Sequence, residues 1–176
     1  MAEYLIADLH LFDTGIINYE ARPFKNIEEY HTKLINNWNK TVKPDDTVYI
    51  LGDVGPVGMC GVDELSNIIT KLNGHRRLVL GNHDKEYGFS ALDWDYIGFE
   101  YVYDMPVVYN GFMILSHEPL YVNERAPFVN IYGHVHGNPN YKFVSKCGAC
   151  VCVERIGYKP ISIDKIKALI REEMES

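Results

Sequence analysis

The sequence has little of what membrane-spanning, secreted or multidomain proteins need. Its 176 residues contain no apolar run near the ~20 residues that cross a bilayer. The first residues, Met1-Ala2-Glu3, lack the basic and long apolar regions of a secretory signal, so we expect a cytoplasmic protein. Linkers, internal repeats and low-complexity stretches are missing as well. A single domain over residues 1–176 is therefore expected.

Positive charge is also in short supply. There are 17 Lys and Arg residues against 24 Asp and Glu residues, and the formal net charge is −7. This balance argues against an extended nucleic-acid surface, which needs clustered positive charge. Two divalent cations would add four positive charges and change −7 to −3. The acidity therefore remains compatible with a small phosphate ester as substrate.

Cysteine is scarce, at four residues, and the absence of a secretory signal favours reduced thiols. Cys147-x-x-Cys150-x-Cys152 resembles part of a zinc or redox motif, but no second half follows at zinc-ribbon spacing. In a strand, Cys150 and Cys152 would share a face without a direct route to each other. We therefore interpret these cysteines as small buried hydrophobic residues.

The apolar pattern predicts strand–helix units in the first half of the chain and a β-rich second half. Asn26-Ile27-Glu28-Glu29 resembles a capping box that opens a helix, and Asn110-Gly111 is the strongest hairpin signal. Further helices are predicted at residues 62–72 and 163–173. Strands are predicted at residues 4–7, 47–51, 77–80, 101–103, 107–109, 112–115, 129–132, 141–145 and 150–154.

Five short motifs follow the apolar runs of this pattern and use five of the seven histidines. In chain order they are Asp8-Leu9-His10, Gly52-Asp53, Gly81-Asn82-His83-Asp84, Ser116-His117 and Gly133-His134-Val135-His136. Their carboxylate, imidazole and carboxamide groups are ligands that divalent metals such as Mn²⁺, Zn²⁺ and Fe prefer. The ordered set therefore indicates a metal-dependent enzyme.

Each motif taken alone has an ordinary structural explanation. Turns favour Asp and Gly, the Gly-Asn-His-Asp segment could be a turn with a local Asn cap, and two alternating histidines could lie on an exposed strand. The whole series, in this order and with each motif after an apolar run, makes chance a poor explanation. His31 and His75 belong to no motif, and His31 on a predicted helix favours a structural role.

The five motifs resemble the pattern of the calcineurin-like metallophosphoesterase superfamily: D-x-H, G-D, G-N-H-D/E, H and G-H-x-H. Three further segments resemble the compact bacterial and phage branch of that family, at residues 22–24, 116–119 and 158–162. The resemblance covers nearly the whole chain. It implies an α/β fold, a four-layer α/β/β/α sandwich of two mixed sheets with flanking helices, and a two-metal site at strand ends.

The resemblance also implies which residues hold the metals. It assigns Asp8, His10 and His136 to one ion, Asn82, His117 and His134 to the other, and Asp53 to both as a bridging carboxylate. The expected cofactors are two divalent ions per chain, Mn²⁺ first, with Fe, Zn and Ni as alternatives. Two ions ~3.5–4 Å apart supply a hydroxide nucleophile and stabilise charge on the phosphoryl oxygens. The glycines before Asp53, Asn82 and His134 fit turns in which the backbone must approach closely.

Three more residues have expected roles in catalysis or substrate binding. His83 follows a ligand and should diverge from the metals toward substrate, as an acid or transition-state stabiliser. Asp84 would bond the His83 imidazole and orient it. Arg22 is expected to contact substrate phosphate, with an ordinary surface arginine as the alternative. Phe12-Asp13 stands where the compact branch often has Phe-x-His, so a histidine that could contact substrate is missing and the resemblance gives no basis for assigning that branch's substrates.

The sequence therefore predicts a two-metal phosphoesterase that hydrolyses a phosphodiester or phosphomonoester. The expected partner is a small phosphoester, with nucleotides among the candidates, and neither a membrane nor an extended nucleic-acid surface. A catalytically inactive binding or scaffold module on the same fold is the alternative; the presence of His83 and of every ligand argues against it. A metallo-β-lactamase-like enzyme needs H-x-H-x-D-H, whereas Gly137-Asn138-Pro139 follows His136 here.

Overall fold

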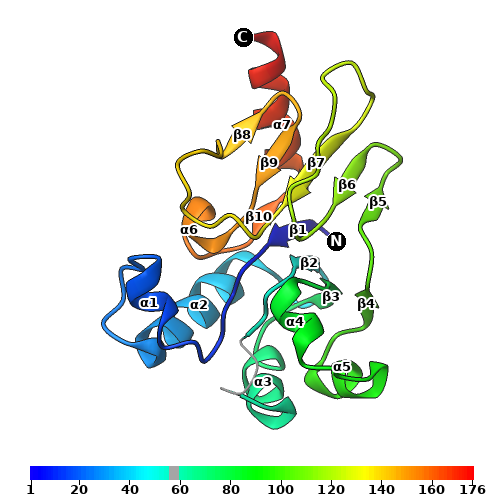
Figure 1. The fold of residues 1–176 in the computed structure, drawn as a ribbon. Coiled ribbons are helices and arrows are strands. Elements are labelled where there is room, and N and C mark those ends of the chain that lie inside the picture. The colour runs from blue at the N-terminus through cyan, green and yellow to red at the C-terminus, as the bar shows by residue number, and fades with distance from the viewer. Residues whose placement is uncertain (56–59) are drawn as a thin grey trace.

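The computed structural model describes residues 1–55 and 60–176, and this part of the chain forms two five-stranded sheets (Figure 1). The first sheet has the strand order β10-β1-β2-β3-β4. Its strands are β1 (Glu3–Ile6), β2 (Thr47–Leu51), β3 (His75–Val79), β4 (Tyr101–Tyr103) and β10 (Ile161–Ser162). Strands β1 to β4 are parallel, and β10 pairs with β1 in the antiparallel sense.

The second sheet has the order β5-β6-β7-β9-β8 and is also mixed. Its strands are β5 (Val107–Tyr109), β6 (Met113–Leu115), β7 (Val129–Tyr132), β8 (Val144–Ser145) and β9 (Gly148–Cys150). Strands β6, β7 and β9 are parallel, whereas β5 and β8 pair antiparallel at the two edges. The predicted Asn110-Gly111 hairpin is confirmed between β5 and β6.

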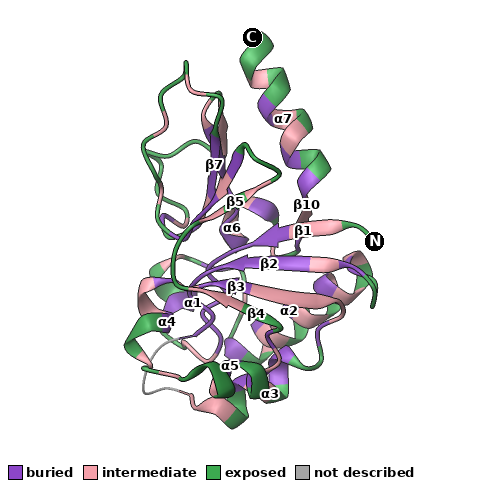
Figure 2. Ribbon diagram, turned by 90° about the vertical axis from the view of Figure 1, so that its right-hand side faces the viewer, coloured by how far each residue is buried: buried purple, intermediate pink, exposed green. Residues whose placement is uncertain are grey.

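Helices cover the first sheet on the side away from the second sheet. Figure 2 shows α2 (Ile27–Thr41) at the height of β3 and β4, α3 (Val62–Ile69) and α5 (Ala91–Ile97) below β4, and the second sheet and α7 (Ile163–Glu175) above β1. This arrangement agrees with the expected α/β class and its two mixed sheets. Within the described residues, no helix combines the length and the apolar character needed to cross a membrane.

Helix α2 follows directly from its sequence. The Asn26 side chain accepts a hydrogen bond from the Glu29 backbone N–H at 2.9 Å, which satisfies one of the free donors at the helix start. The apolar face carries Tyr30, Leu34 and Trp38, all fully buried. Because these side chains repeat at helical spacing, one face of α2 closes the core beneath the first sheet.

The prediction of a strand at residues 150–154 is wrong. Cys150 ends β9, and the chain then turns into the short helix α6 (Val153–Ile156). Its continuous apolar run imitates a strand because the segment is buried on both sides, and a single bridge between Ala7 and Cys152 replaces a regular ladder. Helices α1 (Ile16–Tyr19), α4 (Asn82–Glu86) and α5 went unpredicted because four to seven residues carry little periodicity.

Ala7 joins the two sheets at the carboxyl end of β1. Its backbone N–H donates to the Val151 carbonyl at 2.9 Å, and the Val153 N–H donates to the Ala7 carbonyl at 3.1 Å. The next residue along the chain is Asp8. The loops that carry the five motifs therefore come from two sheets that meet at one shared edge.

Cys150 and Cys152 are fully buried, as expected for small hydrophobic residues. Their sulfur atoms nevertheless lie 3.2 Å apart, so the expectation that the two thiols have no route to each other is wrong. The turn from β9 into α6 brings the side chains together, which a continuous strand would not do.

His31 on α2 provides a test of acid stability at a histidine that belongs to no motif. Its Nε2 accepts a hydrogen bond from the Phe12 N–H at 3.0 Å, and burial lowers the pKa of this imidazole to about 4. As pH falls from about 6.5 toward 4, the unfolded chain takes up a proton at His31 and the folded chain does not, so the free energy of unfolding should fall. His31→Gln keeps an acceptor and does not titrate. In urea titrations of metal-free protein, it should lose less stability between pH 7 and 5 than the wild type.

The control for this prediction is His75→Gln, because His75 lies on β3 with a side chain that is 45% exposed. It should follow the wild-type pH dependence. An equal gain in acid stability from both substitutions would contradict the assignment to His31.

Candidate metal centre

The five motif loops meet at the carboxyl-end edge of the parallel strands. Asp8 follows β1, Asp53 follows β2, and Asn82 begins α4 directly after β3. From the second sheet, His117 follows β6 and His134 follows β7. Parallel strands present their carboxyl ends at the same edge, which is why residues far apart in sequence gather here.

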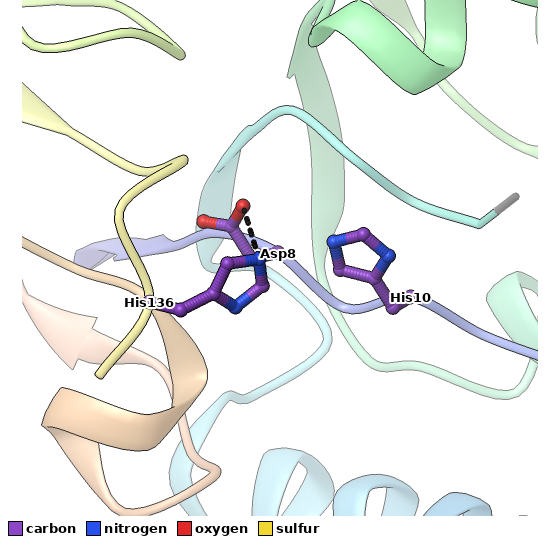
Figure 3. A group of neighbouring side chains, drawn as sticks. All are labelled: Asp8, His10 and His136. Carbon is purple, nitrogen blue, oxygen red and sulfur yellow. Dashed lines mark ion pairs between the residues drawn. The ribbon is translucent and has the colours of Figure 1, made fainter. Parts of the chain in front are cut away.

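Asp8, His10 and His136 form the first group of donor atoms (Figure 3). One ligand atom from each lies within 4.8 Å of the others. His136 Nε2 is 3.7 Å from Asp8 Oδ1, and the rings of His10 and His136 are 5.0 Å apart between centroids. The Asp8 carboxylate also accepts the His134 backbone N–H, at 2.8 Å to Oδ2. One carboxylate and two imidazoles therefore face a common point.

Asp53, His117 and His134 form the second group, and Asn82 joins it. Asn82 Oδ1 is 2.9 Å from His117 Nε2 and 3.1 Å from His134 Nδ1. The two imidazole nitrogens are 3.1 Å from each other. These three atoms form a nearly equilateral triangle of donors, an arrangement that suits coordination of one cation.

The Asp53 carboxylate lies between the two groups. Its Oδ2 is 3.6 Å from His10 Nε2 and 3.4 Å from His117 Nε2, so one oxygen faces a histidine of each group. Its Oδ1 accepts the His83 backbone N–H at 3.1 Å. The structure thus brings together all seven residues that the sequence proposed as ligands, with Asp53 in the central position.

The electrostatics of this cluster fit a divalent cation. Both ring nitrogens of His10 are buried without a hydrogen-bond partner in the described part of the chain, a costly state unless something absent binds them. Burial lowers the pKa of His10 and raises the pKa of Asp8 well above its usual range, with the Asp53 charge adding to the rise at Asp8. A cation at Nε2, which faces Asp53, would satisfy that nitrogen and neutralise the Asp8 and Asp53 carboxylates. The other nitrogen, Nδ1, lies 3.7 Å from Asp13 Oδ2.

The two histidines at the ends of the cluster have fixed ring orientations. His117 Nδ1 lies 2.9 Å from the Leu51 carbonyl, to which it donates when protonated, and this leaves the Nε2 lone pair directed at the cluster. Burial lowers the pKa of His136, but the hydrogen bond to Glu154 and the Asp8 charge outweigh burial and raise it to about 9. In the absence of a cation, Glu154 and Asp8 therefore both favour the protonated form of the His136 imidazole.

The loops of the cluster hold their residues in a backbone conformation that L-amino acids seldom adopt. Positive φ angles occur at Asp8 (61°), His10 (48°), Asp53 (55°), His134 (70°) and His136 (46°). Each such residue costs roughly 1–3 kcal/mol and persists only when surrounding contacts hold it. Here the Asp8 N–H donates to the Gly52 carbonyl and the His10 N–H donates to the Asp53 carbonyl, both at 3.0 Å. Strain gathered on five proposed ligands favours a functional reason for this geometry.

Two glycines allow the loops to pack onto the central carboxylates. A Cβ atom at Gly133 would lie 2.5 Å from Asp8 Oδ2, and one at Gly81 would overlap Asp53 Oδ1. The expectation of close backbone approach at these positions is confirmed. At both positions, a carboxylate of the cluster occupies the space that a larger side chain would need.

Comparison with known proteins places the chain in a family. The uncharacterized protein MJ1445 of Methanocaldococcus jannaschii is 33% identical over 175 residues, which cover 96% of this chain and 91% of that protein. The chain belongs to the MJ1445 family. No family model matches the sequence.

Two further proteins resemble this member of the MJ1445 family. The gene 66 protein of Mycobacterium phage L5 is 39% identical over 82 residues, or 46% of this chain and 39% of that protein. The crystal structure of AQ665 from Aquifex aeolicus, a protein of unknown function, superimposes with a TM-score of 0.71 at 29% identity, and covers 96% of this chain and 99% of that one. The fold is therefore shared over the full length of a solved structure.

His83 lies beside the donor groups on their solvent side. Its ring centroid is 5.4 Å from that of His10, and 40% of its side chain is exposed. The expected contact with Asp84 is replaced by others: Asp84 Oδ2 accepts from the N–H groups of Asp53 and Gly81. Its Oδ1 accepts from the Val54 N–H at 2.8 Å. Asp84 thus holds the loops after β2 and β3 together, and the role of orienting His83 is corrected to this structural one.

Arg22 is buried, with all of its contacts inside the protein. The residue is 3% exposed, and its guanidinium donates to the Leu9 and Asp8 carbonyls at 3.0 and 2.9 Å. Glu154 accepts the remaining bonds. These contacts leave no free face for bidentate binding of a phosphate, so the expected substrate contact is corrected to a buried structural one.

Glu20 and Glu154 lie next to His136 and were missed at the sequence level. Their oxygens and a His136 nitrogen are within 4.8 Å of one another. Glu154 fell in a predicted strand, and Glu20 lies outside every motif. Nothing in the order or spacing of residues marked either position, because the contacts depend on the turn from β9 into α6.

Proposed function

We propose that this chain is a metal-dependent phosphoester hydrolase of the calcineurin-like metallophosphoesterase type. The observation that carries the proposal is the Asp53 carboxylate, with Oδ2 3.6 Å from His10 Nε2 and 3.4 Å from His117 Nε2. A carboxylate with two oxygens, between two groups of nitrogen and oxygen donors, suits a pair of divalent ions. We further propose a single domain with the four-layer α/β/β/α arrangement of that family.

The proposed ligands divide as the geometry groups them. Asp8, His10 and His136 would hold one ion, Asn82, His117 and His134 the other, and Asp53 both. When bound, the two ions would promote attack by water and neutralise charge on the phosphoryl group. Carboxylate, imidazole and amide donors suit Mn²⁺, which we propose as the first choice over Fe, Zn and Ni.

His83 is the proposed catalytic residue outside the ligand groups. Its backbone N–H is anchored on Asp53 Oδ1, and its half-exposed ring stands next to His10 at the open face of the cluster. An imidazole there can donate a proton to the leaving oxygen or a hydrogen bond to a phosphoryl oxygen. This placement supports an enzyme over the inactive module, which would need the donors but no such group.

Two hollows lined by different proposed ligands support a phosphodiester as substrate. One, of about 380 Å³, is lined by Asn82 and His117 together with Lys85. The other, of about 680 Å³, is lined by His134 and His136 and borders on Tyr19. A phosphorus atom at the cluster would have space for one substituent in each hollow. A monoester would use only one of them, so a small diester, nucleotides included, fits better.

The test is hydrolysis of two synthetic substrates by metal-free protein reloaded with Mn²⁺. We expect no turnover without the ion. With Mn²⁺, kcat/KM for a bis-aryl phosphodiester should exceed that for the aryl phosphate by about tenfold, or about 1.4 kcal/mol of transition-state stabilisation. The same two substrates are assayed with protein reloaded with Zn²⁺, Ni²⁺ or Fe²⁺.

The outcomes separate the parts of the proposal. Binding of Mn²⁺ with no turnover of either substrate under any ion would favour the inactive module and overturn the hydrolase. Preference for the monoester would overturn the diester assignment alone.

A further inference from the structure

His136 is held by two adjacent residues of α6. Glu154 Oε1 lies 3.2 Å from His136 Nδ1, on the ring edge opposite the nitrogen that faces Asp8. Arg155 Nε donates to the His136 carbonyl at 2.8 Å, and its Nη2 donates to the Asn138 carbonyl at 2.6 Å. The imidazole and the strained backbone of this proposed ligand are thus both fixed from the same short helix.

Arg22 ties that helix to the loop of Asp8. Its Nε and Nη2 donate to Glu154 Oε1 at 2.9 and 2.7 Å, while Nη1 and Nη2 donate to the carbonyls of Leu9 and Asp8. The Arg22 side chain is fully buried, and the side chain of Glu154 is 9% exposed. One guanidinium therefore connects the backbone of the first motif to the carboxylate that faces the last motif.

We propose that Glu154, held by Arg22, is a positioning residue that fixes the His136 ring with its Nδ1–H toward Glu154, so that Nε2, the nitrogen that would bind a cation, faces Asp8. The proposal rests on the metal centre described above. Metal-binding histidines commonly donate their second N–H to a carboxylate, which sets the tautomer and ring orientation. Glu154 supplies that carboxylate from a residue 18 positions beyond His136.

The buried ion pair is better explained by positioning than by stability. Removing two charges from water costs about as much as their attraction returns, so a buried pair is weak support for folding. Glu154 makes its contacts to Arg22 and His136 through Oε1, while Oε2 has no hydrogen-bond partner among the described residues. The single oxygen Oε1 therefore faces the Arg22 guanidinium and the His136 ring at the same time.

Glu20, His136 and Glu154 also satisfy the distance criterion for a cation group of their own. The Arg22 guanidinium argues against an ion there, because it lies 2.7 Å from Glu154 Oε1 and would repel a second positive charge. An additional bound ion that Glu154→Gln removes would identify a cation site instead and overturn the positioning role.

The first experiment measures Zn²⁺ and Mn²⁺ binding to metal-free protein by calorimetry. Glu154→Gln keeps the shape of the side chain and removes its charge, and should weaken one binding step by about 10–100-fold. The matched control is Glu100→Gln, because Glu100 Oε1 faces His75 Nδ1 at 2.5 Å in an exposed pair outside the cluster. The control should bind both ions as the wild type does. Unchanged affinity in Glu154→Gln would overturn the proposal.

A second measurement needs no variant and remains valid if Glu154→Gln fails to fold. In Zn²⁺-loaded wild-type protein, nitrogen-15 NMR should show His136 with a protonated Nδ1 and a slowly exchanging proton on it. A His136 ring protonated at Nε2, with Nδ1 free for the ion, would contradict the assignment. If Glu154 only supported the fold, it would not select between the two neutral tautomers of His136.

Arg22→Lys tests the connection between Arg22 and Glu154. It should weaken the same binding step as Glu154→Gln, and the double variant should lose less affinity than the product of the two single losses. Independent, multiplicative losses would show that Arg22 does not act through Glu154. These readouts involve no substrate. If the variants bind metal more weakly and the wild type hydrolyses nothing, the positioning role is supported and the hydrolase is overturned. If the variants bind metal normally and the wild type is active, the hydrolase is supported and the positioning role is overturned.

Discussion

Replacement of Asp53 by Asn should reduce phosphoesterase activity to background and weaken cation binding at both donor groups. The physical reason is the position of Oδ2, which faces His10 Nε2 at 3.6 Å and His117 Nε2 at 3.4 Å. Asparagine offers one neutral oxygen and an amide that competes for the same space. Calorimetry with Mn²⁺ should show a loss of stoichiometry or affinity at both sites, and activity should fall by more than about 10³-fold, as for loss of a principal charge-stabilising group.

The matched control is Asp95→Asn, an equal change of charge on the exposed face of α5. It should bind Mn²⁺ and hydrolyse substrate as the wild type does. Metal-free Asp53→Asn should unfold at the wild-type temperature or above it, because the substitution removes a charge that raises the pKa of both Asp8 and Asp84. Two sites of unchanged affinity in Asp53→Asn would remove this residue from the bridging position.

The second large effect is expected for His83→Ala, which should lower kcat by about 10²–10⁴-fold, the usual contribution of a general acid. Metal binding should not change, because the His83 ring lies outside both donor groups, and its neighbour Glu86 is 3.7 Å away on the exposed side. Steady-state kinetics with the bis-aryl diester and Mn²⁺ calorimetry measure the two quantities separately.

His75→Ala is the control, since His75 is also a half-exposed histidine beside a glutamate, with 45% of its side chain exposed. It should retain full activity. Equal activity of His83→Ala and wild type would show that the metal cluster alone carries the reaction. A fall in Mn²⁺ affinity would instead make His83 part of the metal site.

The parts of the fold that the sequence predicted well are those with local causes. Helix α2 begins at its Asn26 cap and follows a regular apolar face, and β2 begins and ends at the expected residues, Thr47 and Leu51. The segment at residues 150–154 was mistaken for a strand because burial on both sides looks the same in a helix and a strand.

The proposed ligands were also foreseeable, for a topological reason. Each motif stands directly after a predicted strand, and parallel strands bring their carboxyl ends to one edge whatever the length of chain between them. Their positions at strand ends were sufficient to predict that they gather at one edge, whereas their division between two ions came from the family resemblance. Their roles as ligands stay predictions until cation binding is measured.

Partners of buried charges were not foreseeable in the same way. The Arg22–Glu154 bond joins residues 132 positions apart, and Asp84 meets the Asp53 backbone across 31. In the sequence, Arg22 indicated a phosphate contact and Asp84 a partner for its neighbour His83. The first interpretation used the chemistry of arginine and the resemblance at residues 22–24, and the second used nearness along the chain. The actual partners depend on how distant loops lie across each other.

The amino-acid sequence alone was enough to predict the α/β class, the main strands and the residue types gathered for metal chemistry, because periodicity and strand-end position are local properties. Tertiary structure was needed to establish that Asp53 lies between two donor groups, that His83 stands outside them, and that α6 holds His136. These are relations between loops of two different sheets. Their distances follow from the packing of the sheets at Ala7, which no single segment encodes.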